Sequence, residues 1–178
     1  TGYEMTRTLT TLYDEVLHVI TRDGNSSLRN FSRKTISVGP VKGGTMSLAK
    51  ATLAHLGVSM DENTWQHEGL KEGLENLSSG KTDAVCVVTG VGNQLIANSL
   101  RKGGLKLLSL GSQPAIKLSY TYPFVQPTRI PAAAYPISPG KGFPKTALAS
   151  VGVKVVLACS SELAENAAFN LTDSLFQN

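Results

Sequence analysis

The sequence predicts an α/β fold, and three of its features indicate this. Short apolar segments rich in Val and Ile alternate along the chain with segments whose leucines recur every three or four residues. Glycine-rich loops follow two of the apolar segments and directly precede a helical segment. The 178 residues suffice for one substantial domain or two small lobes. Strands separated by helices of about ten residues indicate βαβ units, so we expect mostly parallel sheets.

Strands are expected where β-branched and other apolar residues dominate. The first covers residues 12–20 and ends in a polar turn at 22–27. Segment 58–66 reads as an irregular connection that can hold a short strand. The other expected strands are residues 35–39, 83–89, 105–110 and 151–158.

Helices are expected where apolar residues share one face. A short helical turn is predicted at 28–34, and a final helix from residue 161 to about 176 with Ser160 or Ser161 as its N-cap. Residues 123–144 hold six of the eight prolines and are therefore expected to form an extended loop. The remaining helices are predicted at residues 46–56, 68–77, 93–102 and 113–121.

Composition and charge exclude several classes of protein. Apolar residues make up 41% and charged residues 17% of the chain, a globular balance. The net charge is +4, but the basic residues are scattered singly or in pairs, which argues against nucleic-acid binding. No apolar run approaches the roughly 20 residues of a membrane span. The chain opens on Thr1 without a leader pattern, so we expect a processed or excised piece.

The two cysteines, Cys86 and Cys159, each lie in an apolar run typical of a strand. Buried free thiols fit this setting, and a disulfide stays open as the alternative if the two strands are neighbours. A Cys-x-x-Cys pair, or a cysteine beside a histidine at metal-ligand spacing, does not occur. We therefore predict no metal site and no cofactor.

The loop of residues 39–45 joins a predicted strand to a predicted helix. Gly43 and Gly44 permit a close approach of the backbone, and Thr45 can cap the helix and offer a hydroxyl. The first N–H groups of such a helix favour a negatively charged group. The spacing fits neither a Walker A loop nor G-x-G-x-x-G. A strand-to-helix turn without a ligand remains an open alternative.

A second glycine loop, residues 89–93, has the same setting after a buried strand and before a helix. In open α/β sheets, ligands bind outside the carboxyl ends of the strands. We expect the two loops to face a shared cleft.

A catalytic constellation is not visible. His18, His55 and His67 fall in different predicted elements, so packing or capping is expected for each. The pairs Asp14-Glu15 and Asp61-Glu62 read as solvated side chains rather than acid–base dyads. An enzyme is therefore the least favoured class, and the protein is predicted not to be one.

Seven motifs occur in one order along nearly the whole chain. They include Val38-Gly-x-x-x-Gly-Gly-Thr45, Thr89-Gly-Val-Gly-Asn93 and Tyr122-Pro-Phe124, and the others lie within residues 12–22, 77–84, 130–136 and 151–157. This series resembles the TAXI family, the immunogenic solute receptors of TRAP-type transporters.

The resemblance implies a type II periplasmic-binding-protein-like fold with two α/β lobes, in the periplasm or another extracytoplasmic space. Its partners would be a small anionic or zwitterionic solute, such as the amino acid glutamate or another carboxylate, and the subunits of a membrane transporter. An effector-sensing regulatory domain of the same fold is the alternative. The implied ligand-binding residues are Gly43, Gly44, Thr45 and Met46 in the first loop, Thr89, Gly90 and Asn93 in the second, and Tyr13 and Tyr135 at the seam between the lobes.

Receptors of this family are longer than this chain, which would lack their N-terminal third. The resemblance therefore implies a complete second lobe over residues 22–87 and a partial first lobe from residues 1–21 and 88–178. Half a lobe leaves a sheet face and an edge uncovered. We expect self-association or pairing with a companion fragment.

Overall fold

The computed structural model describes residues 5–22, 28 and 31–177. Contacts divide the chain into two compact units. The larger one is Glu15–Val153, and the smaller one contains the described residues of 1–14 and 154–178. The lobe boundaries predicted at residues 22 and 87 do not coincide with this division and remain a prediction about the lobes of the receptor.

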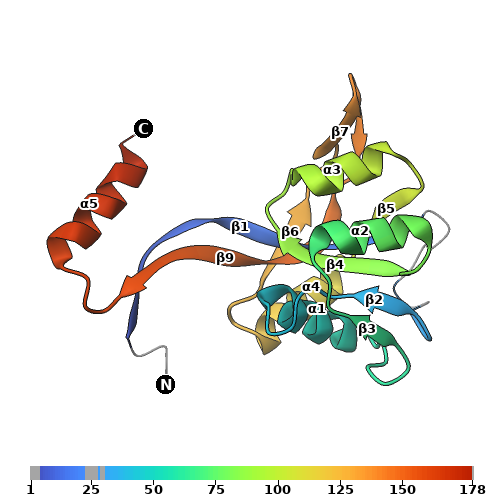
Figure 1. Cartoon of the computed structure of the whole chain (residues 1–178), viewed down its shortest axis with the longest axis horizontal. Coiled ribbons are helices and arrows are strands. Elements are labelled where there is room, and N and C mark those ends of the chain that lie inside the picture. Colours follow the sequence, from blue (N-terminus) through green and yellow to red (C-terminus); the bar gives the residue numbers. More distant parts are fainter. Residues whose placement is uncertain (1–4, 23–27, 29–30, 178) are drawn as a thin grey trace. The chain divides into compact units, whose positions relative to one another are not determined.

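One seven-stranded sheet organises the chain (Figure 1). Its order is β3-β2-β4-β1-β9-β6, and β5 also pairs with β1. A separate hairpin joins β7 (Tyr135–Ser138) to β8 (Lys141–Phe143). The strands of the large sheet are β1 (Thr6–Arg22), β2 (Thr35–Ser37), β3 (Thr64–Gln66), β4 (Ala84–Thr89), β5 (Leu105–Leu108), β6 (Gln126–Ile130) and β9 (Leu148–Ser160).

The sheet is mixed, so the prediction of mostly parallel pairing is wrong. Strand β2 pairs in parallel with β3 and β4, whereas β1 runs antiparallel to both β4 and β5, and β6 antiparallel to β9. Helical crossovers relate β2, β3, β4 and β5 to one another. Because no such crossover leads to β1, this strand is free to enter the sheet in the opposite direction.

Helices cover both faces of the sheet in the larger unit (Figure 1). Helices α1 (Gly44–His55) and α4 (Ser112–Thr121) lie on one face, and α2 (Leu70–Ser79) and α3 (Gln94–Arg101) on the other. The side chains of β1 alternate between the two faces of the sheet. Leu17 and Val19 point toward the face covered by α1 and α4, and Val16 and Ile20 toward the face covered by α2 and α3. The predicted α/β architecture is confirmed, and the structure places helices on both faces of its sheet.

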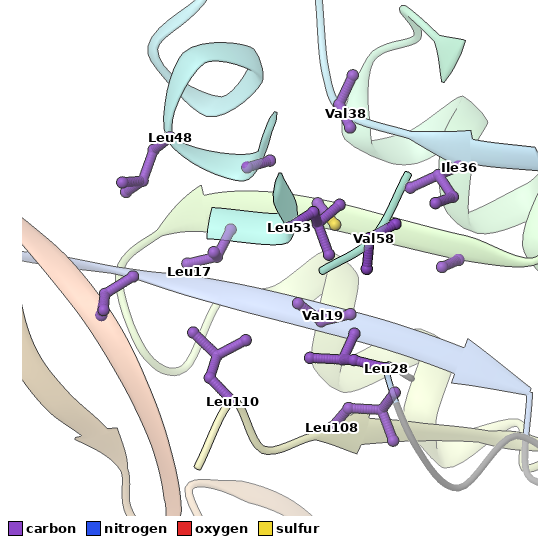
Figure 2. Close-up of a cluster of buried hydrophobic side chains, with 14 of the residues drawn as sticks. Leu17, Val19, Leu28, Ile36, Val38, Leu48, Leu53, Val58, Leu108 and Leu110 are labelled. Atoms are coloured by element: carbon purple, nitrogen blue, oxygen red, sulfur yellow. The ribbon is translucent and has the colours of Figure 1, made fainter. Parts of the chain in front are cut away.

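The cluster on the α1 face holds the largest group of buried apolar side chains (Figure 2). Figure 2 shows Leu17 and Val19 of β1, Ile36 of β2 and Leu53 of α1 gathered in it. Leu53 and Ile36 are fully buried, and truncating such a side chain to Ala typically removes about 2–5 kcal/mol of stability. This packing fixes α1 on the sheet and thereby fixes the loop that precedes it.

Residues 123–144 are not the continuous loop that their prolines predicted, since β6, β7 and β8 lie within or across this range. In β6, Pro127 is paired with Val151. Strand β6 ends the sheet order, and an edge strand tolerates the missing N–H of a proline. Proline content alone therefore misled the prediction.

The final helix, α5 (Glu165–Phe176), begins later than predicted. Its N-cap is Ala164, without a side-chain hydrogen bond, and the hydroxyl of Ser160 instead accepts a hydrogen bond from the N–H of Glu162 in the preceding turn. Of the short helical turn predicted at 28–34, residues 29–30 lie outside the described part. Cys86 and Cys159 are both free thiols in the structure.

The smaller unit contains few buried side chains. Lys154 and Asp14 form an ion pair of 2.7 Å, and the N–H of Ser161 donates to the carbonyl of Met5. Helix α5 buries none of its residues, and Phe169 is 68% exposed. Self-association through such a surface remains a prediction. No helix among the described residues is long and apolar enough to cross a membrane.

Candidate functional site

A cavity of about 470 Å³ opens beside the first turn of α1, wholly within the larger unit. Its volume falls in the range of small-molecule sites. Most of its wall is apolar, and it contains residues from β1, α1, β4, β9 and the segment after α4. The lining residues are Glu15, Gly44, Thr45, Ser47, Leu48, Ala51, Val88, Tyr122, Phe124 and Val153.

The loop before α1 is a tight turn that places Thr45 against the end of β4. The N–H of Gly43 donates to the carbonyl of Pro40 at 3.0 Å. Gly39 has a φ of +79°, and a Cβ there would lie 3.1 Å from the Cβ of Thr45. Glycine is therefore required at position 39, both for its backbone conformation and for the space that Thr45 occupies.

Helix α1 has no side-chain cap, so the prediction that Thr45 caps it is wrong. The N-cap is Gly43, and the Thr45 hydroxyl instead accepts a hydrogen bond from the N–H of Val88 at 3.1 Å. The first N–H groups of any α-helix lack intrahelical partners and lie at its positive end. Because Gly44 and Thr45 line the cavity, this end of the cavity favours a negatively charged group.

Glu15 is the one charged residue among those lining the cavity. It is partly buried, and within the described part of the chain its carboxylate has no hydrogen bond or ion pair. The sequence interpretation treated it with Asp14 as a solvated pair and did not select it as a residue of the binding site. Alternation along β1 could have revealed this, because Glu15 continues the row of Leu17 and Val19 toward the α1 face.

Two aromatic residues form the wall that follows α4. The rings of Tyr122 and Phe124 lie 5.9 Å apart between centroids and are tilted by 54°. Tyr122 packs partly against the α1-face cluster, whereas Phe124 is 65% exposed. In the sequence, residues 122–124 were one of the seven motifs that resemble the family, and no role was assigned to these two rings.

In the second glycine loop, residues 89–93, a side chain of the loop itself caps the N-terminus of α3. Asn93 caps α3, since its Oδ1 accepts from the N–H of Leu95 at 3.0 Å. Its Nδ2 donates to the hydroxyl of Thr89, also at 3.0 Å. Val88, directly before this loop, lines the cavity, but Thr89, Gly90 and Asn93 are not among its lining residues. The predicted roles of these three as solute contacts remain untested predictions.

On the opposite face of the sheet, Tyr135 is buried against His18. Burial lowers the pKa of His18 to about 4, so its imidazole is neutral. Its Nδ1–H donates to the carbonyl of Val16 at 2.8 Å, and its Nε2 therefore accepts from the Tyr135 hydroxyl at 2.6 Å. Burial also raises the pKa of Tyr135.

The remaining sequence-predicted residues are not among those lining the cavity. Met46 packs against the α1-face cluster, and Gly43 forms the turn before α1. Tyr13 lies in the smaller unit and is 54% exposed. The structure thus brings Gly44 and Thr45 together with Glu15, Tyr122 and Phe124, which the sequence had not selected.

Solved structures with the same fold include ArgBP from T. maritima. An arginine-bound single-residue variant of that protein superposes with a TM-score of 0.52 at 11% identity, over 97% of this chain and 59% of the other. The arginine-bound form of a truncated ArgBP gives a TM-score of 0.53 at 10% identity, over 98% and 60%. The chain thus spans about 60% of the length of these proteins. The fold is that of type II periplasmic binding proteins.

A protein-family model matches the chain over residues 1–178. The chain belongs to the NMT1-like family.

Proposed function

From its membership of the NMT1-like family, we propose that this chain is the solute-binding part of an extracytoplasmic receptor. The observation that supports this best is the cavity beside α1, which combines an uncapped helix N-terminus with an apolar wall. Sites for small molecules in proteins are typically concave and mostly apolar, with a few convergent polar groups. ArgBP, whose fold the chain shares, is arginine-bound in the matched structures, which agrees with a binding role.

In this proposal, the backbone N–H groups of Gly44 and Thr45 bind a carboxylate or a similar negative group of the solute. The hydrogen bond from Val88 to the Thr45 hydroxyl holds this first turn against the end of β4. Leu48 and Val153 supply apolar contact for the body of the solute. Binding rather than catalysis follows, because the residues lining the cavity include no nucleophile paired with a base.

The finer assignment is to a TAXI receptor that delivers its solute to the membrane subunits of a TRAP-type transporter. It is supported by the order of the seven sequence motifs, from the loop at 38–45 to the strand at 151–157. In such a receptor, the solute stabilises one conformation by binding it more tightly than the others.

Screening for a bound solute tests the proposal directly. The purified chain is mixed with a library of amino acids, amines, monocarboxylates and dicarboxylates, and its melting temperature is measured. A solute that binds only the folded state raises this temperature, and titration calorimetry then gives its affinity. The result expected is at least one solute with a micromolar or tighter Kd.

A pair of substitutions locates the site. Ala51→Trp places a large ring in the cavity wall and should reduce solute affinity at least 100-fold without unfolding the protein. Leu95→Trp, at a 42% exposed position on α3 outside the cavity lining, is the matched control and should leave affinity unchanged. The proposal fails if no library member binds, or if a bound solute is insensitive to Ala51→Trp.

A further inference from the structure

The charge of the cavity wall differs from that of the chain. The chain carries 17 Lys and Arg against 13 Asp and Glu, for a net charge of +4. The cavity lining nevertheless contains no Lys, Arg or His, and Glu15 is its one charged residue. A solute with two negative groups would therefore meet a carboxylate without any cationic side chain in the wall to offset it.

The position of Glu15 is fixed by the sheet. It lies in β1 two residues before Leu17, on the same face of the strand, and Leu17 is 1% exposed in the core. At the neighbouring strand, a Cβ on Gly152 would lie 2.7 Å from the carbonyl oxygen of Glu15. Only glycine permits this close approach of β9 to β1. The carboxylate consequently projects from a strand whose backbone is packed closely against β9, and this backbone cannot shift as that of a loop residue could.

The carboxylate of Glu15 also lacks a partner within the described residues, unlike the carboxylates of Asp83 and Asp14. Asp83 is contacted by Arg22 and Lys34, and Asp14 by Lys154. A cationic group bound beside this carboxylate would form a charge-assisted hydrogen bond with it, so such a group is favoured at this position.

The aromatic wall suits the same kind of group. The rings of Tyr122 and Phe124 lie beside each other in the cavity wall, and aromatic faces attract ammonium and guanidinium groups. The aliphatic side chains of Leu48 and Val88 complete a wall that favours an apolar body.

Building on the proposed function, we propose that the solute carries a positively charged amine bound by Glu15 and an aliphatic or aromatic body bound by the apolar wall. Its chemical class is an amine or apolar amino acid, and Glu15 is the residue that selects it. Dicarboxylates such as glutamate, which the family resemblance suggested, are disfavoured by the same carboxylate.

Matched analogues test this inference. Calorimetry is performed with leucine, phenylalanine and lysine, with the corresponding acids that lack the α-amino group, and with the corresponding amines that lack the carboxylate. Glutamate and succinate represent dicarboxylates. We expect at least one amine-bearing compound to bind, and we expect loss of its amine to weaken affinity at least tenfold.

The variant Glu15→Gln keeps the size of the side chain and removes its charge. It should weaken binding of the amine-bearing compounds at least tenfold and leave the affinity of the acids without an amine unchanged or improved. Glu72→Gln is the control for net charge, because Glu72 is exposed on α2 at the opposite face of the sheet. It should change no affinity, and the melting temperatures of both variants show whether they fold.

The outcomes separate the inference from the proposed function. If a dicarboxylate, glutamate included, or a monocarboxylate without an amine binds the cavity and no amine or monocarboxylate amino acid does, the inference is overturned and the proposed function stands. Equal affinity of the amines for Glu15→Gln and the unchanged protein overturns the inference in the same way. If no solute of any class binds, both are overturned.

Discussion

The loops before α1 and α3 look alike in sequence but differ in whether a side chain caps the N–H groups of the helix that follows. Each follows a strand of one sheet and brings glycines to the start of a helix. At α3, the side chain of Asn93 accepts a hydrogen bond from the N–H of Leu95 and donates one to the hydroxyl of Thr89. At α1, the N-cap is Gly43 and no side chain caps the helix. A glycine loop becomes a candidate binding site only where its own side chains leave the helix amides free.

The largest expected effect concerns His18, which is buried and hydrogen-bonded to Tyr135. Burial lowers the pKa of His18 from 6.5 to about 4, so between these pH values the unfolded chain binds more protons than the folded one. The free energy of unfolding should rise with pH across this window. The contribution of His18 is complete above pH 6.5 and is lost as pH falls to about 4. Its size is about 3 kcal/mol.

Urea unfolding measured at several pH values checks this expectation. The carboxylates of the protein add their own pH dependence, so the comparison is with His18→Gln. This variant should show a flatter rise of stability between pH 4 and 6.5. Parallel pH profiles for the two proteins would contradict the assigned role.

Removing the Tyr135 hydroxyl, which donates to His18, should have the next largest effect. Tyr135→Phe leaves Nε2 of His18 without its hydrogen-bond partner. A buried polar group left unsatisfied costs about 1–3 kcal/mol, so the melting temperature should fall. Tyr120→Phe is the matched control, because Tyr120 is 82% exposed, and it should change nothing measurable. A similar fall in both variants would show that the buried hydroxyl has no special role.

At the first loop, Thr45→Val removes the acceptor of the Val88 N–H while keeping the shape of the side chain. We expect the first turn of α1 to lose its fixed position and solute affinity to fall about tenfold, or about 1.4 kcal/mol. Thr45→Ser retains the hydroxyl and should bind nearly as well as the unchanged protein. Calorimetry with a solute from the screen measures both, and equal affinities for Val and Ser variants would refute this role of the hydroxyl.

The corresponding change in the second loop should be the smallest in its effect on binding. Asn93→Ala removes the cap of α3, which typically lowers stability by about 1 kcal/mol. Because the cavity lining does not include Asn93, solute affinity should change less than twofold. Chemical denaturation and calorimetry on the same sample separate the two effects. An affinity loss as large as that of Thr45→Val would show that this loop takes part in solute binding.

Much of the fold could be predicted from the sequence, because it depends on periodicity. The leucines that recur along α2 and the apolar runs of β4 and β9 placed these elements correctly, to within a few residues at their ends. The direction of β1 could not be predicted, since strand direction depends on pairing between distant segments. Proline content at 123–144 concealed β6, whose edge position makes Pro127 harmless.

The candidate site was predictable only in part. Gly44 and Thr45 were visible because glycine before a helix has a local signature. Glu15 was not selected, although alternation along its strand places it on the α1 face. Tyr122 and Phe124 reach the cavity through tertiary packing of the segment after α4, for which no local pattern exists. Local sequence patterns thus identified the residues at the start of α1. The lining residues of β1 and of the segment after α4 could be identified only from the folded structure.

Amide chemical shifts test the central difference between the two loops most directly. A ¹⁵N-labelled sample is titrated with the tightest-binding amine or amino acid of the screen, and two-dimensional NMR spectra are recorded. The account predicts large, saturable shifts for the amides of Gly44, Thr45 and Glu15, and small ones for residues 90–93. Large shifts at 90–93, with residues 44–47 unchanged, would contradict it.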